Sequence, residues 1–253
     1  MRPAAQRVFR HLMNARYGND GLVRVNQNGR SWRLVPEVAL RGEYAEFQTI
    51  EWLRRVVKPG GCVIDIGANV GQMTLEAALL VGPTGRVVAV EPAPGNAKVL
   101  RRHVVGNGFE DRVTIIEAAC GAHDGTEIVL HIVGDAADSI GSGHSERKLE
   151  HEGPSIEFKV PVVTLDRIAI DHRPSVVKID VEGAELNVLE GAAKALSTYR
   201  PAVQIGFHPF AFDDAIGASR QLLDRMESFG YSTSHIGPGP LELEEYAFEG
   251  RAS

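Results

Sequence analysis

Three short stretches of this chain place carboxylates and glycines where a parallel sheet could use them for chemistry. The first, VIDIGANVG at residues 63–71, has an apolar strand pattern that reaches Asp65 and then a turn containing Gly67, Asn69 and Gly71. A helix is predicted to follow from about residue 70. Such a strand, turn and helix presents backbone N–H groups and a positive helix end at the carboxyl edge of a sheet. A ligand that carries a carboxylate would suit that position.

A second carboxylate follows the next predicted strand. The stretch RVVAVEP, residues 86–92, ends in Glu91 and Pro92. A carboxylate at this place can accept hydrogen bonds from both hydroxyls of a ribose. The two stretches together indicate an adenosine that carries an amino-acid tail in place of a pyrophosphate.

The glycine-rich turn lacks the signatures of two common nucleotide sites. A dinucleotide fingerprint needs the pattern G-x-G-x-x-G, whereas this turn offers Gly67, Asn69 and Gly71. A Walker loop ends in Gly-Lys-Ser/Thr, and GANVGQMT contains no lysine. Dinucleotide binding and phosphate cradling are therefore both disfavoured.

The third stretch, VKIDVEGAE at residues 177–185, carries charged side chains on a strand and on the turn into a helix. The two-residue period of a strand places Lys178 and Asp180 on the same side of the sheet. Asp180 and Glu182 could also cap the helix that follows, since acidic groups are favoured at helix N-termini. The capping role and a role in a site can coexist.

The elements that must position these residues alternate between apolar runs and helical segments from about residue 44 onward. This alternation predicts an α/β domain over residues 45–253, with a parallel sheet covered by helices on both faces. Residues 1–44 are predicted to form an N-terminal appendage, a helix over 3–16 and a hairpin that turns at Asn28-Gly29. The domain is expected to begin with a helix at 45–57 and to place its strands at 62–66, 86–91, 112–117, 176–180, 201–206, 230–236 and 243–248.

One segment, residues 126–165, interrupts the alternation. Two extended runs, TEIVLHIV and SIEFKVPVVTL, flank a polar loop at residues 134–154 that is rich in glycine and serine. We interpret the segment as an insertion beside the site, because binding and catalytic groups are often carried on such loops.

Composition and charge exclude several classes of protein. The chain has 253 residues and a net charge of −6, and beyond residue 45 it carries 19 basic and 30 acidic side chains, which argues against nucleic-acid binding. Its two cysteines have neither disulfide nor zinc-ligand spacing, so a reducing cytoplasmic location is expected. No apolar stretch approaches the roughly 18 residues of a membrane span, and the N-terminus lacks a signal-peptide core. We expect no membrane partner.

Four stretches resemble, in their order and spacing, the FkbM family of S-adenosylmethionine-dependent O-methyltransferases. They are VIDIGANVGQMT, VVAVEPAPGNAKVLRRHVVGNG, VTLDRI and VKIDVEGAELNVLEGA, within roughly residues 44–208. A lone glycine turn is a weak signal, but four ordered motifs in matching strand contexts are a strong one. The resemblance implies the class I methyltransferase fold, a Rossmann-like seven-stranded α/β sandwich whose final strand is antiparallel.

The resemblance also implies which residues contact the cofactor, S-adenosylmethionine. Residues expected around its methionine moiety are Asp65, Gly67, Asn69 and Gly71. Glu91 with Pro92 is expected at the ribose, Glu117 with Ala118 at the adenine edge, and Glu46 at the methionine amino group. Asp180 and Glu182 would lie beside the sulfonium and the acceptor, where carboxylates can orient a hydroxyl or hold a cation.

Methyl transfer to a hydroxyl requires that one proton be removed, so a general base or a metal is expected near the acceptor oxygen. His144 lies in the glycine-flanked inserted loop, and a histidine titrates near neutral pH, so we predict it as the base. Asp180 and Glu182 are the alternatives. Acceptor contacts are predicted for Ser139, His144 and His208, whereas His11, His103 and His123 are expected on surface helices or turns.

A tightly held divalent metal such as Mg²⁺ is not predicted. The family often has a glutamate where this chain has Gln204, and an amide binds a divalent ion less well than a carboxylate. Asp180 and His208 would be the remaining ligands.

The sequence leaves the methyl acceptor open. The polar loop at 134–154 favours a hydroxylated ligand, so a saccharide is the first expectation and a polyketide or macrolide hydroxyl the second. An NAD-dependent oxidoreductase and a non-catalytic protein that binds S-adenosylmethionine are the more distant alternatives. If the chain forms a homodimer, its N-terminal segment is the expected contact.

Overall fold

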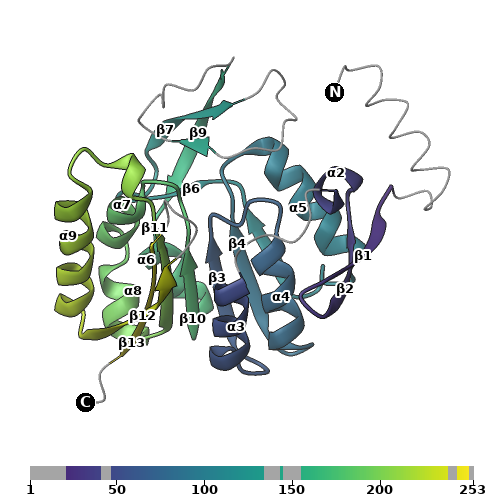
Figure 1. The fold of residues 1–253 in the computed structure, drawn as a ribbon, viewed down its shortest axis with the longest axis horizontal. Helices are drawn as coiled ribbons and strands as arrows, with labels where there is room; N and C mark the ends of the chain where they lie inside the picture. The colour runs from purple at the N-terminus through teal and green to yellow at the C-terminus, as the bar shows by residue number, and fades with distance from the viewer. Residues whose placement is uncertain (1–20, 41–46, 134–142, 145–154, 239–243, 251–253) are drawn as a thin grey trace.

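A seven-stranded sheet forms the centre of the protein (Figure 1). The computed structural model describes residues 21–40, 47–133, 143–144, 155–238 and 244–250. Across the sheet the strands follow the order β12-β13-β11-β10-β3-β4-β5. Their bounds are Cys62–Ile66 (β3), Arg86–Val90 (β4), Val113–Ile116 (β5), Val176–Ile179 (β10), Ala202–Phe207 (β11), Tyr231–Pro238 (β12) and Glu244–Gly250 (β13). Each lies within a few residues of its predicted position.

The directions of the strands match the predicted fold. Strands β5, β4, β3, β10 and β11 are parallel, whereas β13 is antiparallel to both of its neighbours, β11 and β12. The class I methyltransferase sheet with an antiparallel final strand is therefore confirmed.

Helices cover both faces of the sheet. One face carries Phe47–Val56 (α3), Gln72–Val81 (α4) and Pro94–Gly106 (α5), and the other carries Leu165–His172 (α6), Glu185–Glu190 (α7), Ala193–Tyr199 (α8) and Ala215–Ser228 (α9). A short helix, Pro36–Ala39 (α2), and a 3₁₀ turn, Pro209–Ala211 (η1), complete the helical elements of the described residues. Within that part of the chain, no helix combines the length and the apolar character needed to cross a membrane.

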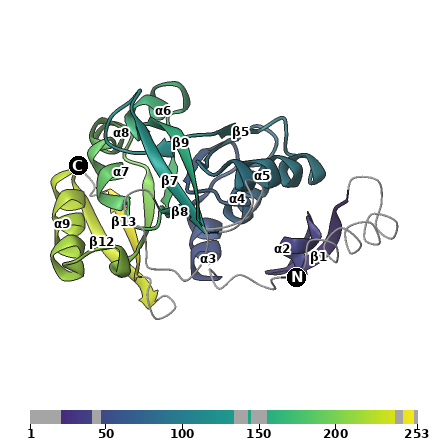
Figure 2. The ribbon, with the colours of Figure 1, turned by 90° about the horizontal axis from the view of Figure 1, so that it is seen from above.

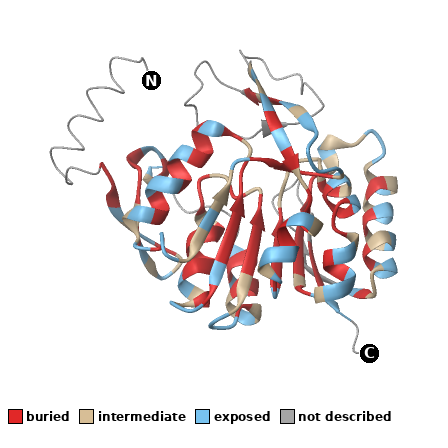
Figure 3. Ribbon diagram, turned by 180° about the vertical axis from the view of Figure 1, so that it is seen from behind, coloured by how far each residue is buried: buried red, intermediate tan, exposed pale blue. Residues whose placement is uncertain are grey.

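Alternate side chains of each central strand enter the two layers of helices. In β3, Val63 belongs to the hydrophobic cluster with α3, α4 and α5, whereas Ile64 and Ile66 belong to the cluster with α6 to α9. This follows from the two-residue period of a strand. The central strands are buried along almost their whole length (Figure 3), as expected for a parallel sheet covered on both faces.

The predicted N-terminal hairpin is confirmed. Strands Val23–Gln27 (β1) and Arg30–Leu34 (β2) pair in an antiparallel register that leaves Asn28 and Gly29 as a two-residue turn. Both turn residues have positive φ, 52° and 74°, as the hairpin turn favoured by Asn-Gly requires. The predicted helix at 3–16 lies outside the described residues.

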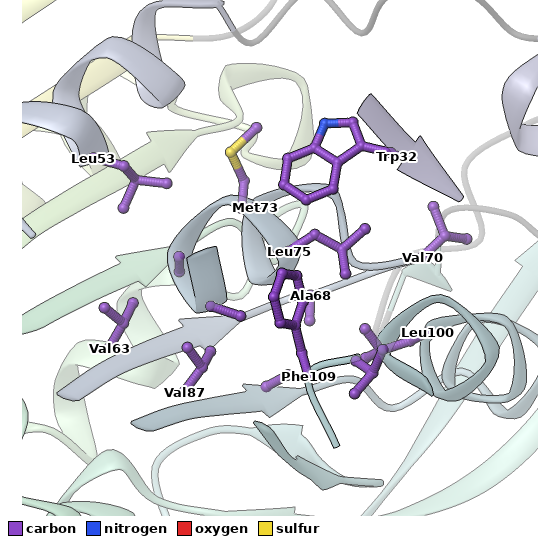
Figure 4. Close-up of a cluster of buried hydrophobic side chains, with 14 of the residues drawn as sticks. Trp32, Leu53, Val63, Ala68, Val70, Met73, Leu75, Val87, Leu100 and Phe109 are labelled. Carbon is purple, nitrogen blue, oxygen red and sulfur yellow. The ribbon is translucent and has the colours of Figure 1, made fainter. Parts of the chain in front are cut away.

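The inner side chains of the hairpin belong to the main hydrophobic core. Trp32 packs edge-on against Phe109, with the ring centroids 6.5 Å apart, and shares a cluster with Val70 and Leu100 (Figure 4). The hairpin therefore forms part of the layer that contains α3, α4 and α5.

A buried carboxylate joins the hairpin to two helices. Glu76 of α4 is 2% exposed, and its Oε1 accepts hydrogen bonds from Nε of Arg30 at 3.2 Å and from Nε of Arg54 at 2.8 Å. Arg54, in α3, also donates through Nη2 to the carbonyl of Asn28 at 2.7 Å. One carboxylate thus holds β2, α3 and α4 together.

The inserted segment forms a second, smaller sheet. Strands Glu127–Val133 (β7) and Ser155–Val163 (β9) are antiparallel, and the short strands Ala119–Cys120 (β6) and Gly143–His144 (β8) pair with β9 and β7 respectively. The two extended runs predicted here are confirmed. Figures 1 and 2 show β7 and β9 crossing above one end of the main sheet.

We predict that Glu76→Gln lowers the free energy of unfolding by about 1–3 kcal/mol, because two guanidinium groups lose a buried ionic acceptor. Urea unfolding followed by circular dichroism measures this change. Glu51→Gln is the matched control, since Glu51 also pairs with Arg54 but is about half exposed, and its effect should stay below about 0.5 kcal/mol. Equal effects of the two variants would contradict the role assigned to Glu76.

Candidate cofactor and acceptor site

A cavity that is open to solvent lies between the carboxyl edge of the main sheet and the smaller sheet. Its polar wall comes from the turns after β3, β4 and β10, and its apolar wall includes Cys120 at the end of β6 and Ile128 and Leu130 of β7. The described lining includes the carboxylates of Glu91, Asp180 and Glu182 and no basic side chain. The cavity is therefore acidic and suits a ligand with positive charge or with hydroxyl donors.

The turn after β3 approaches the turn after β10 so closely that only glycine fits. Gly67 has φ of 76°, and a Cβ on it would lie 1.8 Å from the carbonyl oxygen of Asp180. The N–H of Gly67 donates to the carbonyl of Val90 at 2.9 Å, which ties the same turn to the end of β4. The close packing at Gly67 thereby holds the backbone of Asp180 in the cavity wall.

Glu91 organises the turns around it. Its Oε2 accepts from the N–H of Asn69 at 2.8 Å, and its Oε1 accepts from the N–H of Ala93 at 2.9 Å and the side-chain amide of Asn96 at 3.1 Å. Burial raises the pKa of Glu91, and the three hydrogen bonds partly offset that effect. The side chain is 4% exposed and lines the cavity, so Glu91 presents a carboxylate to a ligand from a fixed position.

A row of side chains with alternating charge lies beneath the cavity. Nζ of Lys178 is 3.6 Å from Asp65 Oδ1 and 3.2 Å from Asp180 Oδ2, and it is 3.4 Å from the carbonyl of Gly67. The other oxygen of Asp180 lies 3.4 Å from Nε2 of His208. Nδ1 of His208 is 2.8 Å from Oε1 of Glu185. Asp180 thus has a cationic group or an imidazole beside each of its oxygens.

The carboxylates around His208 favour its protonated form. Burial alone lowers the pKa of this histidine, but the hydrogen bond to Glu185 and the charges of Asp180, Glu185 and Glu182 outweigh burial, and its pKa is raised. Glu185 is fully buried and also accepts the N–H of Gly183 at 3.0 Å. The imidazole therefore connects the turn after β10 to the end of β11.

Six of the predicted site residues line this cavity: Gly67, Asn69, Glu91, Pro92, Asp180 and Glu182. Two others lie behind its wall. Asp65 accepts from the hydroxyl of Thr74 at 2.6 Å, and Gly71, with φ of 95°, would place a Cβ 2.3 Å from Leu100 of α5. Because of this turn, α4 begins at Gln72, two residues later than predicted.

Three predicted residues, Glu117, Ala118 and His208, are absent from the described lining of the cavity. Glu117 is about half exposed and pairs with Arg101, and Ala118 is buried beside it. Nε2 of His208 lies 3.4 Å from Asp180, which does line the cavity. Glu46, Ser139 and the side chain of His144 lie outside the described residues, so their roles stay predictions.

Glu185 was not predicted as a site residue. Its signal in the sequence is weak, because a glutamate at the start of a helix is common and suggests exposure. Among the described residues, no group of three or more potential metal ligands is found. Gln204 on β11 lies beside Lys178 in the register of the sheet, and its buried Oε1 has no hydrogen-bond partner in the described structure.

The strand order, the antiparallel final strand and the cavity at the carboxyl edge of the sheet are those of the class I methyltransferase fold. The chain belongs to the family described as the methyltransferase FkbM domain, whose model matches residues 65–233. The resemblance seen in the sequence is therefore confirmed.

Individual relatives give further comparisons. The chain is 30% identical over 155 residues to a probable cobalt-precorrin-6B C(15)-methyltransferase (decarboxylating) of Sulfolobus acidocaldarius, a match that covers 59% of this chain and 77% of the relative. Among solved structures, an rRNA methylase from Streptococcus thermophilus matches with a TM-score of 0.50 and 12% identity over 83% of this chain and 98% of that chain. The methyltransferase FkbM from Methylobacillus flagellatus matches with a TM-score of 0.49 and 19% identity, over 78% of this chain and 50% of that chain.

The family implies S-adenosylmethionine as the methyl donor, and the cavity fits it. The donor carries positive charge on sulfur and nitrogen, and the described wall supplies carboxylates. The buried carboxylate of Glu91 matches a ribose diol, and the apolar wall of Ile128 and Leu130 matches a flat ring.

We predict that Glu91→Gln weakens the binding of S-adenosylmethionine by about 1–3 kcal/mol, because the site loses a charged acceptor and the amide NH₂ faces at least one of the donors that now bond to Glu91. Isothermal titration calorimetry measures the change. Glu190→Gln, on an exposed position of α7, should bind as the wild type does. Unchanged affinity in Glu91→Gln would remove Glu91 from the cofactor site.

We predict that His208 stabilises the fold more at low pH than at high pH. Its pKa is raised in the folded state, so its contribution is complete below the ordinary histidine pKa of about 6.5 and is lost as the pH rises through the folded value. The difference in unfolding free energy between wild type and His208→Gln should therefore shrink from pH 6 to pH 9, by about 1.4 kcal/mol per unit of pKa shift. A difference that grows over this range would contradict the assignment.

Proposed function

We propose that this protein transfers a methyl group from S-adenosylmethionine to a hydroxyl of a saccharide. The observation that carries the proposal is the position of Asp180, in the cavity wall with Lys178 at one oxygen and His208 near the other. A carboxylate fixed in this way can accept a hydrogen bond from an acceptor hydroxyl and orient its oxygen.

The protein's own residues must accept one proton, which the acceptor hydroxyl loses as it is methylated. S-adenosylmethionine supplies a methyl group that is already activated, so positioning accounts for much of the rate. Asp180 is the described carboxylate best placed to hold the hydroxyl proton, with the His208–Glu185 pair behind it. His144, on β8 of the smaller sheet, is the second candidate for the base.

The lining of the cavity supports a neutral, hydroxyl-rich acceptor. Its described polar side chains are the carboxylates of Glu91, Asp180 and Glu182 and the amides of Asn69 and Asn96, all able to accept a hydroxyl proton in a hydrogen bond. A saccharide presents several hydroxyls in a small volume, whereas a polyketide or macrolide presents fewer and is the second choice.

C-methylation is the alternative that the relatives raise, because the cobalt-precorrin enzyme acts at a carbon and removes a carboxylate. An acceptor that loses a carboxylate is an anion, and the described wall of the cavity is itself acidic. Repulsion between like charges disfavours that acceptor here. We therefore place O-methylation first.

We also propose a cytoplasmic location and a homodimer that uses the N-terminal segment. Both Cys62 and Cys120 are free thiols, in keeping with a reducing compartment. Burial raises the pKa of Cys62 to about 11 and that of Cys120 to about 12, so neither is primed for disulfide exchange. Size-exclusion chromatography with light scattering tests the dimer.

Mass spectrometry of products from a panel of acceptors tests the proposed reaction. The panel contains sugars and oligosaccharides, macrolide alcohols and a precorrin-type tetrapyrrole, each incubated with the protein and S-adenosylmethionine. A mass gain of one methyl group on a saccharide supports the proposal, and a product from the tetrapyrrole alone overturns it. Calorimetry with S-adenosylmethionine and with NAD separates a methyltransferase from an oxidoreductase, and cofactor binding with no product from any acceptor indicates a non-catalytic protein.

We predict that Asp180→Asn lowers kcat by about 10²-fold or more at saturating cofactor and acceptor, because the amide cannot take the proton. Asp171→Asn, on an exposed turn of α6, is the matched control and should keep wild-type kcat. His144→Ala is measured in parallel. A loss of about 10²–10⁴ in that variant, with less than about fivefold in Asp180→Asn, would move the base to His144.

A further inference from the structure

His103 lies at the junction of three segments that are distant in the sequence. Although it was expected on a surface helix, it is 1% exposed, because the hairpin packs over the face of α5 that carries it. Its Nε2 is 2.9 Å from the backbone nitrogen of Val35, which follows β2, and its Nδ1 is 2.7 Å from the carbonyl oxygen of Val70. The expectation of a surface position was wrong.

The two contacts define which ring nitrogen carries the proton. The backbone N–H of Val35 can only donate, so Nε2 of His103 must accept and cannot bear a hydrogen. In the neutral ring the proton is then on Nδ1, which donates to the carbonyl of Val70. Burial lowers the pKa of His103 to about 4, so the ring is neutral at physiological pH.

Val70 belongs to the glycine-rich turn of the cofactor cavity. Its N–H donates to Oδ1 of Asn69 at 2.8 Å, and the N–H of Asn69 donates to Glu91 at 2.8 Å. Asn69 has φ of 50°, a left-handed conformation that costs energy in a residue other than glycine and has to be held by its surroundings. Glu91 holds one side of this turn, and His103 holds the other.

We propose that His103 is a positioning residue of the cofactor site, and that through its ring the N-terminal hairpin fixes the turn that contacts S-adenosylmethionine. The hairpin lies before residue 65, where the match to the family begins, so this connection adds a segment outside the family domain to the site. The inference rests on the cofactor binding named in the proposed function.

Two substitutions of His103 test the hydrogen bonds of its two ring nitrogens separately. His103→Asn can place its amide NH₂ near the position of Nδ1 and keep the donor to Val70, whereas His103→Gln can place an oxygen near Nε2 and keep only the acceptor for Val35. We expect the Kd for S-adenosylmethionine, measured by calorimetry, to rise about tenfold in His103→Gln and less than about threefold in His103→Asn.

A backbone variant tests the contribution of the hairpin. Val35 has φ of −62°, which proline adopts, so Val35→Pro removes the N–H that sets the tautomer of His103 with little change in backbone conformation. Val35 does not line the cavity, yet we expect its replacement to raise the Kd about threefold. Hydrogen exchange of the cofactor-free protein should show faster exchange at the Asn69 amide in Val35→Pro and His103→Gln.

Asn107→Ala is the matched control for a purely structural effect. Asn107 also joins α5 to the hairpin, since its side chain accepts the N–H of Arg33 and donates to the carbonyl of the same residue, each at 2.9 Å, but it does not contact the glycine-rich turn. It should lower the melting temperature and leave the Kd unchanged. If the Kd follows the melting temperature across all four variants, the proposal is wrong. If the wild type does not bind S-adenosylmethionine, the proposed function fails, but the exchange rates still test whether His103 connects the hairpin to the glycine-rich turn.

Discussion

The geometry of the site depends on the approach of two backbone turns, at Gly67 and at the carbonyl of Asp180. Strands β3 and β10 are neighbours and parallel, so the turns that follow them leave the sheet side by side. The N–H of Asp180 still donates to the carbonyl of Ile66 at 3.0 Å, and one residue later there is no room for a side chain. Any Cβ at position 67 would push the two turns apart. The distance between the Asn69 turn and the Asp180 carboxylate is therefore set by the absence of a side chain at one position.

The charged row beneath the cavity is a second constraint that follows from the first. Asp65 and Glu185 are almost completely buried, and each has one oxygen without a hydrogen-bond partner in the described structure. Burial of a carboxylate is costly unless a cationic or hydrogen-bonding partner lies next to it. Lys178 lies beside Asp65, and His208, whose pKa is raised, lies beside Glu185. A buried row of this kind gives little net stability, but it limits the orientations that Asp180 can take. We infer that this row of charges positions the Asp180 carboxylate at the edge of the sheet.

The sequence predicted those parts of the site that lie at the ends of neighbouring strands. Gly67, Glu91 and Asp180 were found because parallel strands bring their carboxyl ends to one edge, which is a property of any such sheet. Contacts that depend on the order of the strands were not found, and the pairing of His208 with Glu185 is one of them, because it exists only since β11 lies beside β10. His103 shows a different limit. The helical period tells which residues share a face of α5, but not that a hairpin from about 70 residues earlier covers that face.

The position of β13 between β11 and β12 has a consequence for the order in which the chain can assemble. Strand β12 is made before β13, yet among the described strands β12 pairs with β13 alone. During synthesis, helix α9 and strand β12 are therefore available before residues 244–250. Until those residues are made, the edge of β11 that pairs with β13 stays open. An open edge is a template for pairing with other chains. Before β13 inserts, the open edge of β11 makes a nascent chain of this fold prone to aggregation. Insertion of β13 covers that edge.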